Sequence, residues 1–174
     1  MKRILITGMS GTGKSSVIRE LKARGFDAHD LDTPDWSHWV DADPSDALTP
    51  VPGKDWVWRE ERVRALLLRP RRVPLFVGGS ADNMGQFLCL IDEVVLMSAP
   101  VETVMARLAA RPAGAYGAGE DDRQKVCELI ATIEPRLRGI ASHEVDSRGS
   151  IAATVDTILD AVLRPAPDPR IPPA

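Results

Sequence analysis

The sequence predicts an α/β fold built on a parallel β-sheet. Runs of aliphatic and β-branched residues at 3–7, 73–77 and 91–97 alternate with segments of helical periodicity. Runs that are apolar on both faces are typical of strands buried in a parallel sheet. Strands that alternate with helices give parallel neighbours joined by right-handed crossovers. The first run is followed at once by a glycine-rich loop and a helical segment, which is the expected start of a strand–helix–strand unit.

The remaining elements follow from apolar periodicity and from the residues that interrupt it. Two further strands are expected, at 26–30 and, more weakly patterned, at 142–145. Helices are expected over 14–24, 56–68, 101–111, 121–138 and 151–163. Gly25 ends the first helix, and Pro70 and Pro74 end the second. Pro135 lies inside the fourth helix and is expected to kink or divide it.

Composition limits the function classes. The chain has 174 residues, which suits one domain of ordinary size. A net charge of -3 argues against a non-specific nucleic-acid binder. No apolar run approaches the roughly 18 residues of a membrane span, and 4–6 is too short for a signal-peptide core. The two cysteines lack metal-ligand spacing, which indicates a reducing, cytoplasmic location. We expect one domain over 1–164, with an insert at about 33–60, a lid at about 111–122 and a proline-rich tail at 165–174.

One motif carries specific chemistry. Residues 8–15 match G-x-x-x-x-G-K-[ST], between a predicted strand and a predicted helix. Backbone N–H groups of such a loop surround phosphate oxygens, and the following helix directs its positive end at them. Lys14 is expected to reach the β- and γ-phosphates, and Ser15 to ligate Mg²⁺. The predicted nucleotide-binding residues of this loop are Gly8, Gly11, Thr12, Gly13, Lys14, Ser15 and Ser16.

The order of loop, insert, helix, strand, arginine-bearing helix and lid resembles the small P-loop kinases, such as adenylate, shikimate and gluconate kinases. The resemblance covers roughly residues 1–164. It implies a three-layer P-loop NTPase fold, with a five-stranded parallel sheet in the order 2-3-1-4-5, a substrate-binding insert and a lid. The chain has no Asn-Lys-x-Asp guanine-reading sequence, which argues against a GTPase.

Three arginines are assigned to the nucleotide. Arg107 and Arg111 lie four residues apart at the end of a predicted helix that enters a glycine-rich loop, so they share one helix face. The resemblance implies that Arg107 stacks on adenine and that Arg111 reaches the phosphates as a catalytic residue. A guanidinium can also spread the charge of a transferring phosphoryl group. Arg148 occupies the place where the family's loop borders the adenine.

The Asp30-Leu-Asp32 sequence follows the second predicted strand and resembles the Asp-x-Asp of shikimate kinase. Alternation along an extended segment places both carboxylates on one side. Asp30 is assigned to Mg²⁺ and to the substrate. Asp32 is nearer the insert, so we expect it to orient or deprotonate an acceptor hydroxyl.

The remaining substrate-binding residues are expected in the insert and after the third strand. The insert region carries all four tryptophans, and Trp36 is assigned to substrate stacking. Arg59 is a candidate for an acceptor phosphate, as is Arg62, because nucleoside-monophosphate kinases have arginines in this region. Gly78, Gly79 and Ser80 lie at the carboxyl edge of the sheet, where open α/β folds bind ligands.

These residues favour an enzyme that uses ATP and Mg²⁺ to phosphorylate a small molecule. Lys14, Asp32 and Arg111 are the predicted catalytic residues. The acceptor stays open between a hydroxyl metabolite, a nucleoside monophosphate and an antibiotic. Nucleic acid and membrane are not expected as partners, and the protein is expected to be a monomer or a homodimer. The alternative is an ATP-binding sensor or regulatory ATPase without a small-molecule acceptor.

Overall fold

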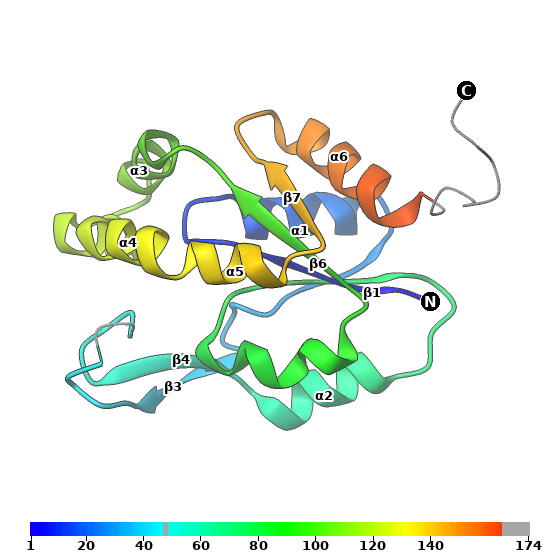
Figure 1. Ribbon diagram of the computed structural model, residues 1–174, viewed down its shortest axis with the longest axis horizontal. Helices are drawn as coiled ribbons and strands as arrows, with labels where there is room; N and C mark the ends of the chain where they lie inside the picture. The colour runs from blue at the N-terminus through cyan, green and yellow to red at the C-terminus, as the bar shows by residue number, and fades with distance from the viewer. Residues whose placement is uncertain (47–48, 165–174) are drawn as a thin grey trace.

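The central sheet has five parallel strands. The computed structural model describes residues 1–46 and 49–164. The strands are β1 (Arg3–Thr7), β2 (Asp27–Asp30), β5 (Leu75–Gly78), β6 (Glu93–Ser98) and β7 (His143–Asp146). Their order is β2-β5-β1-β6-β7, and every neighbouring pair is parallel; Figure 1 labels β1, β6 and β7 of this sheet. Counted along the main sheet, this order is 2-3-1-4-5, so the predicted fold class and strand order are confirmed.

Helices cover both faces of the sheet, which gives three layers. Side chains alternate along β1, so Ile4 and Ile6 pack with α1 (Lys14–Ala23) and α6 (Ile151–Leu163). Leu5 faces the opposite core, which contains residues of α2 (Glu60–Leu68) and of the 3₁₀ segment η1 (Asp82–Leu90). The two cores are separate clusters of buried residues on opposite sides of β1.

The long helix predicted after the lid is divided, as its proline indicated. The structure has α4 (Glu120–Thr132) and α5 (Glu134–Ile140), with Pro135 in the first turn of α5. Helix α3 (Val101–Ala109) packs on α4 through Val104, Leu108 and Val126. The lid sequence therefore connects the end of α3 to the start of α4, two helices that pack against each other.

The insert differs from the prediction. Residues 56–58 are not the start of a helix, because they lie in β4 (Lys54–Trp58), which pairs antiparallel with β3 (Ser37–Asp41). Helix α2 begins only at Glu60. The nine-residue η1 segment was also not predicted. Residues 47–48 of the insert and the proline-rich tail at 165–174 lie outside the described residues.

The hairpin formed by β3 and β4 is attached to the rest of the fold through Trp58 and Ser37. The backbone N–H of Trp58 donates to Asn83 Oδ1, and its carbonyl accepts from Asn83 Nδ2, both at 2.9 Å. Ser37, opposite Trp58 in the hairpin, donates through its hydroxyl to Leu31 O at 2.5 Å. The hairpin is thus fixed to the segment after β2 and to η1, next to the carboxyl edge of the sheet. Among the described helices, none is long and apolar enough to cross a membrane.

Candidate functional site

The glycine-rich loop wraps the start of α1 as its sequence predicts. A Cβ built at Gly8 would lie 2.3 Å from the backbone oxygen of Met97, so only glycine lets the loop approach β6 this closely. Gly13, the N-cap residue of α1, has no side chain with which to cap the helix, and the first turn contains no acidic residue. The positive end of α1 is therefore left for an anion to cap. Thr12 stabilises the loop from within, because its buried hydroxyl donates to Met9 O at 2.8 Å.

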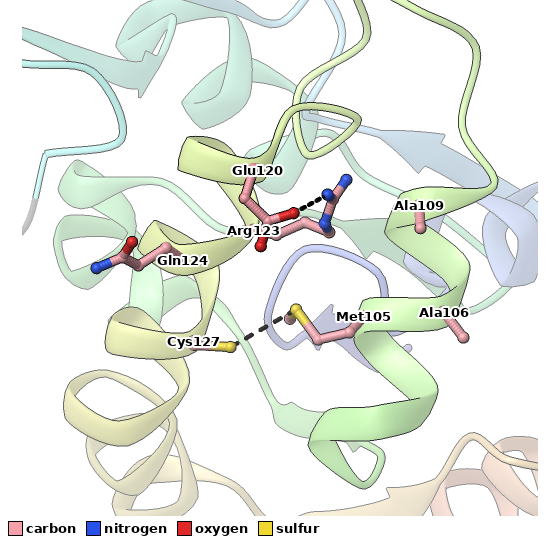
Figure 2. A pocket seen from close by; sticks show the side chains of 7 residues that line it. All are labelled: Met105, Ala106, Ala109, Glu120, Arg123, Gln124 and Cys127. Atoms are coloured by element: carbon pink, nitrogen blue, oxygen red, sulfur yellow. Dashed lines mark hydrogen bonds and ion pairs between the residues drawn. The ribbon is translucent and has the colours of Figure 1, made fainter.

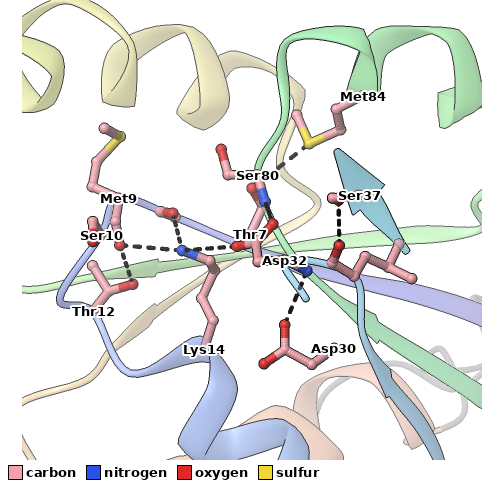
Figure 3. Close-up of polar contacts among 12 residues, drawn as sticks. Thr7, Met9, Ser10, Thr12, Lys14, Asp30, Asp32, Ser37, Ser80 and Met84 are labelled. Carbon is pink, nitrogen blue, oxygen red and sulfur yellow. Dashed lines mark hydrogen bonds and ion pairs between the residues drawn. The ribbon is translucent and has the colours of Figure 1, made fainter. Parts of the chain in front are cut away.

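Lys14 and Asp32 face each other at the base of this loop (Figure 3). Lys14 Nζ lies 4.0 Å from Asp32 Oδ2 and donates to Gly8 O at 2.7 Å. The Lys14 side chain is 10% exposed and that of Asp32 27%. Burial lowers the pKa of Lys14, against the opposing field of Asp32, and burial raises the pKa of Asp32, against Lys14 and the Ser80 N–H. Both charged groups are thus partly removed from water, and each charge is stabilised by the opposite charge of the other.

Asp32 is held at a defined position. Its Oδ1 accepts from the backbone N–H of Ser80 at 3.0 Å, and its own N–H donates to Asp30 Oδ1 at 3.1 Å. A Cβ at Gly79 would lie 2.7 Å from Asp32 Oδ1, so glycine at this position leaves the space that the carboxylate occupies. Gly78 has a different role, since its missing side chain makes room for Ile18 of α1.

The two lid arginines contact different parts of the loop. Arg111 donates through Nη1 to Ser10 Oγ at 3.2 Å and to the backbone oxygen of Tyr116, which connects the glycine-rich loop with the lid. Arg107 donates to Ser147 O at 2.6 Å and, at 3.4 Å, to the carbonyls of Gly11 and Thr12. Arg107 therefore ties the phosphate loop to the segment after β7.

A single cavity of about 790 Å³ joins the loop to the hairpin. Many of the predicted site residues line it, namely Gly8, Gly11, Gly13, Lys14, Ser15, Ser16, Asp32, Ser80 and Arg111. The opposite part of the lining includes Trp39 and Trp56 of the hairpin, whose rings pack edge to face with centroids 5.0 Å apart. Trp39 is 49% exposed although it belongs to a packed ring pair, so it presents apolar surface to a ligand.

Other predicted residues lie outside the lining of this cavity. The Trp36 ring packs against His29 and lies 4.6 Å beneath the Arg62 guanidinium. Arg59 donates to Pro34 O at 3.3 Å, and Arg148 pairs with Asp146 on the exposed loop before α6. Five further predicted residues also do not line the cavity, although each supports a residue or segment that does: Thr12, Asp30, Gly78, Gly79 and Arg107.

Several cavity residues were not predicted from the sequence. They come from α1, the hairpin, η1, the lid and the α4–α5 pair, and include Arg19, Trp39, Trp56, Met84, Tyr116 and Arg136. The tryptophan cluster was the signal for two of them, but the sequence does not show that Trp39 and Trp56 pair across a hairpin and line the cavity while Trp36 does not. Arg136 follows the break at Ile133, and only the packing of α5 over the sheet brings it to the cavity.

Charge is divided within the cavity. Lys14, Arg19 and Arg111 gather about the phosphate loop, while Asp46, Asp55 and Asp82 lie with the hairpin tryptophans, and Arg136 lines the cavity from α5. Burial raises the pKa of Asp55, and the nearby carboxylate of Asp82 raises it further. The basic part suits an anionic phosphate chain, and the part near the hairpin suits a ligand without a second strong negative charge.

Oxygen donors for a magnesium ion are present beside the loop. The Ser15 hydroxyl lies at the exposed start of α1, Asp30 is the last residue of β2, and Asp32 lies in the turn that follows. Hydroxyl, carboxylate and phosphate oxygens are the ligands that Mg²⁺ takes at nucleotide sites. No group of three or more His, Cys, Asp or Glu side chains within 1–46 and 49–164 is placed to hold a metal ion. The residues present thus fit an ion that is held partly by phosphates.

A second pocket, of about 430 Å³, lies between α3 and α4 (Figure 2). Met105 Sδ and Cys127 Sγ meet there at 3.5 Å, and Arg123 at its rim pairs with Glu120. None of the predicted site residues lines it. The larger cavity is therefore the candidate site.

Comparison with known proteins agrees with the fold. Residues 4–129 match the family described as "AAA domain". Shikimate kinase from Acinetobacter baumannii, solved with shikimate, is 21% identical over 94% of this chain and 93% of its own, with a TM-score of 0.62. Deoxyadenosine kinase from M. mycoides, solved with dATP, is 12% identical over 93% of this chain and 100% of its own, with a TM-score of 0.57. Shikimate kinase from Bacteroides thetaiotaomicron also has a TM-score of 0.57, at 15% identity, over 94% and 99% of the two chains. The curated proteins contain no match.

Proposed function

The chain belongs to the AAA domain family, and from that premise we propose that it is an ATP-dependent phosphotransferase acting on a small hydroxyl-bearing molecule. Its fold is that of the small P-loop kinases. One observation carries the proposal, namely that a single cavity contains a phosphate loop, a carboxylate 4.0 Å from the loop lysine and an aromatic wall. A nucleotide site alone needs only the first of these features.

The nucleotide would bind at the basic part of the cavity. The loop N–H groups and the positive end of α1 bind the phosphates, and Lys14 exchanges its bond to Gly8 O for a phosphate oxygen. Ser15 and Asp30 are the residues that would hold Mg²⁺. When bound, this ion supplies positive charge that neutralises the phosphate oxygens. Arg111 comes from the lid and adds a further positive charge.

The acceptor would bind between Asp32 and the hairpin. Trp39 and Trp56 contact its apolar face, and Asp32 accepts a hydrogen bond from its hydroxyl. The acceptor oxygen forms a bond to the γ-phosphorus as the bond to the bridging oxygen breaks. The hydroxyl proton passes to Asp32, and ADP leaves with the electron pair of the broken bond.

A hydroxyl metabolite suits this site better than a nucleoside monophosphate. Arg59 and Arg62, the candidates for an acceptor phosphate, both lie outside the cavity lining. Arg62 instead lies over Trp36, and Arg59 contacts the backbone of Pro34. Near the hairpin, Asp55 and Asp82 would repel a phosphate.

The test is whether an acceptor accelerates ADP release. Purified protein with ATP and Mg²⁺ is offered sugar acids, polyols, aminoglycoside-like compounds and nucleoside monophosphates, with Lys14→Ala as the blank. The proposal expects one class other than the monophosphates to raise the rate well above the basal rate. A basal rate that no compound changes would favour the ATP-binding sensor.

A further inference from the structure

Trp58 contains a buried polar group without a partner. The side chain, at the end of β4, is 1% exposed. Its indole nitrogen has no hydrogen-bond acceptor among the residues that the structure describes. Buried N–H groups in folded proteins nearly always have an acceptor, so this donor calls for a specific explanation.

The unpartnered N–H faces Asp32. A Cβ built at Gly79 would lie 2.7 Å from Asp32 Oδ1 and 3.2 Å from Trp58 Cζ2, so the carboxylate and the indole edge are both next to the same glycine. Cζ2 belongs to the edge of the indole that also carries the nitrogen. Burial raises the pKa of the Asp32 carboxyl, and the Trp58 side chain acts in the opposite direction.

The direction of this N–H is fixed by the fold. Asn83 holds both backbone polar groups of Trp58 at 2.9 Å. Phe87 packs on the indole ring with centroids 5.5 Å apart. A ring held on its backbone and on its face has little freedom to turn, so its donor is preorganised.

We propose that Trp58 is a positioning residue whose indole N–H donates to the Asp32 carboxylate in solution, before an acceptor binds as well as after. The Ser80 N–H already occupies Oδ1, so the indole supplies a second donor from a different element, and together they fix the rotation of the carboxylate. This inference rests on the proposed function. It deepens that proposal by linking the acceptor hairpin to Asp32.

The link follows from strand geometry. Trp56 and Trp58 are two residues apart in β4, so their side chains leave the strand on the same side. Trp56 lines the cavity, and Trp58 lies next to it in the core. An acceptor that packs on Trp56 therefore contacts β4, the strand that also carries the Trp58 indole N–H.

The contact can be tested by NMR without an acceptor. A ¹H–¹⁵N spectrum of the full chain contains four indole signals, and Trp58→Phe identifies the one from Trp58. A donor to a carboxylate is expected downfield, so Asp32→Asn should move the Trp58 signal upfield while that of Trp36 stays in place. The proposal is overturned if the Trp58 indole signal is the same in Asp32→Asn and in the wild-type protein, with MgATP present or absent.

The role is tested by kinetics with the acceptor that the ADP-release assay identifies. Trp58→Phe should lower kcat about ten- to a hundredfold, as expected for a misplaced catalytic group, with a smaller change in the KM for ATP. Phe87→Leu is the comparison, because it loosens the packing of the ring and keeps the N–H, so it should lower kcat less than Trp58→Phe does.

A second replacement at position 58 keeps the test valid if Trp58→Phe fails to fold. Benzothienylalanine at position 58 keeps the ring shape and replaces the N–H by sulfur, so it should reproduce the loss of kcat. Full kcat in this variant would overturn the positioning role. Failure of every acceptor would instead contradict the proposed function, and the NMR comparison would still decide the contact.

Discussion

Lys14 Nζ lies 4.0 Å from Asp32 Oδ2 across the base of the cavity; Lys14 begins α1, and Asp32 follows β2 by two residues. In the structure Lys14 donates to loop carbonyls, Gly8 O at 2.7 Å and Met9 O at 3.3 Å. A phosphate entering the loop would replace those carbonyls and bring its charge close to Asp32. The hydroxyl that Asp32 holds would then lie beside the phosphate that Lys14 holds.

Asp32→Asn separates phosphotransfer from nucleotide binding. The amide keeps the size of the side chain and its acceptor for the Ser80 N–H, but it cannot take a proton. We expect turnover with the acceptor to fall about 10²- to 10⁴-fold, the usual contribution of a general base. Calorimetric MgATP binding should be retained, because the phosphates contact Lys14. Unchanged turnover would remove Asp32 from the mechanism.

Arg111→Ala and Arg107→Ala should have different effects. Arg111 lines the cavity, so its loss should lower turnover about a hundredfold or more with little effect on stability. Arg107 ties Gly11 and Thr12 to Ser147, so its loss should reduce the free energy of unfolding by about 1.5–3 kcal/mol. Urea unfolding and steady-state kinetics on both variants measure the difference. Equal effects of the two variants on both readouts would contradict these roles.

Trp39→Ala should weaken acceptor binding selectively. The ring is half exposed in the cavity wall, so removing it should change the free energy of unfolding little. The KM for the acceptor should rise about tenfold, which corresponds to loss of one aromatic contact, while the KM for ATP stays unchanged. Trp36→Ala is the matched control, since Trp36 lies outside the cavity lining. An equal rise in both variants would place the acceptor elsewhere.

Glu144 predicts a pH dependence of stability. The Arg138 guanidinium, bonded to both carboxylate oxygens, lowers the pKa of Glu144 to about 2 from its usual 4.5. A carboxyl with a lowered pKa in the folded state stabilises the fold above pH 4.5, and this contribution is lost as the pH falls towards 2. Because the side chain is 37% exposed, we expect Glu144→Gln to cost about 1 kcal/mol at pH 7.

Urea unfolding of wild type and Glu144→Gln at a series of pH values measures this effect. The gap between the two proteins should close as the pH approaches 2. A gap of constant size from neutral to acid pH would mean that Glu144 acts through packing and not through its charge.

Most of the fold could be predicted because its signals are local. Apolar runs such as 91–97, and breaks such as Gly25 and Pro135, depend only on neighbouring residues. The hairpin could not be predicted in this way, because residues 56–58 form a strand only by pairing with residues 37–39 across a long connection. Their apolar side chains fit the start of the next helix equally well.

The candidate site likewise contains residues that the sequence could predict and residues that it could not. The phosphate loop and Asp32 follow directly from motif and strand order, and the structure brings them together. Trp39 and Arg136 reach the cavity through tertiary packing of the hairpin and of α5, which no sequence spacing encodes. The assignment of Trp36 to the substrate rested on the clustering of tryptophans alone, and in the structure its ring packs with His29 and Arg62 outside the cavity lining.

The most direct test of the central claim follows the γ-phosphate itself. ATP labelled at the γ-position is incubated with Mg²⁺, the acceptor mixture and either wild type, Asp32→Asn or Lys14→Ala. The account predicts that wild type transfers label to one compound, and that both variants lose this transfer. Label found only in inorganic phosphate, at the same rate with and without the mixture, would contradict phosphotransfer and indicate an ATP-binding sensor.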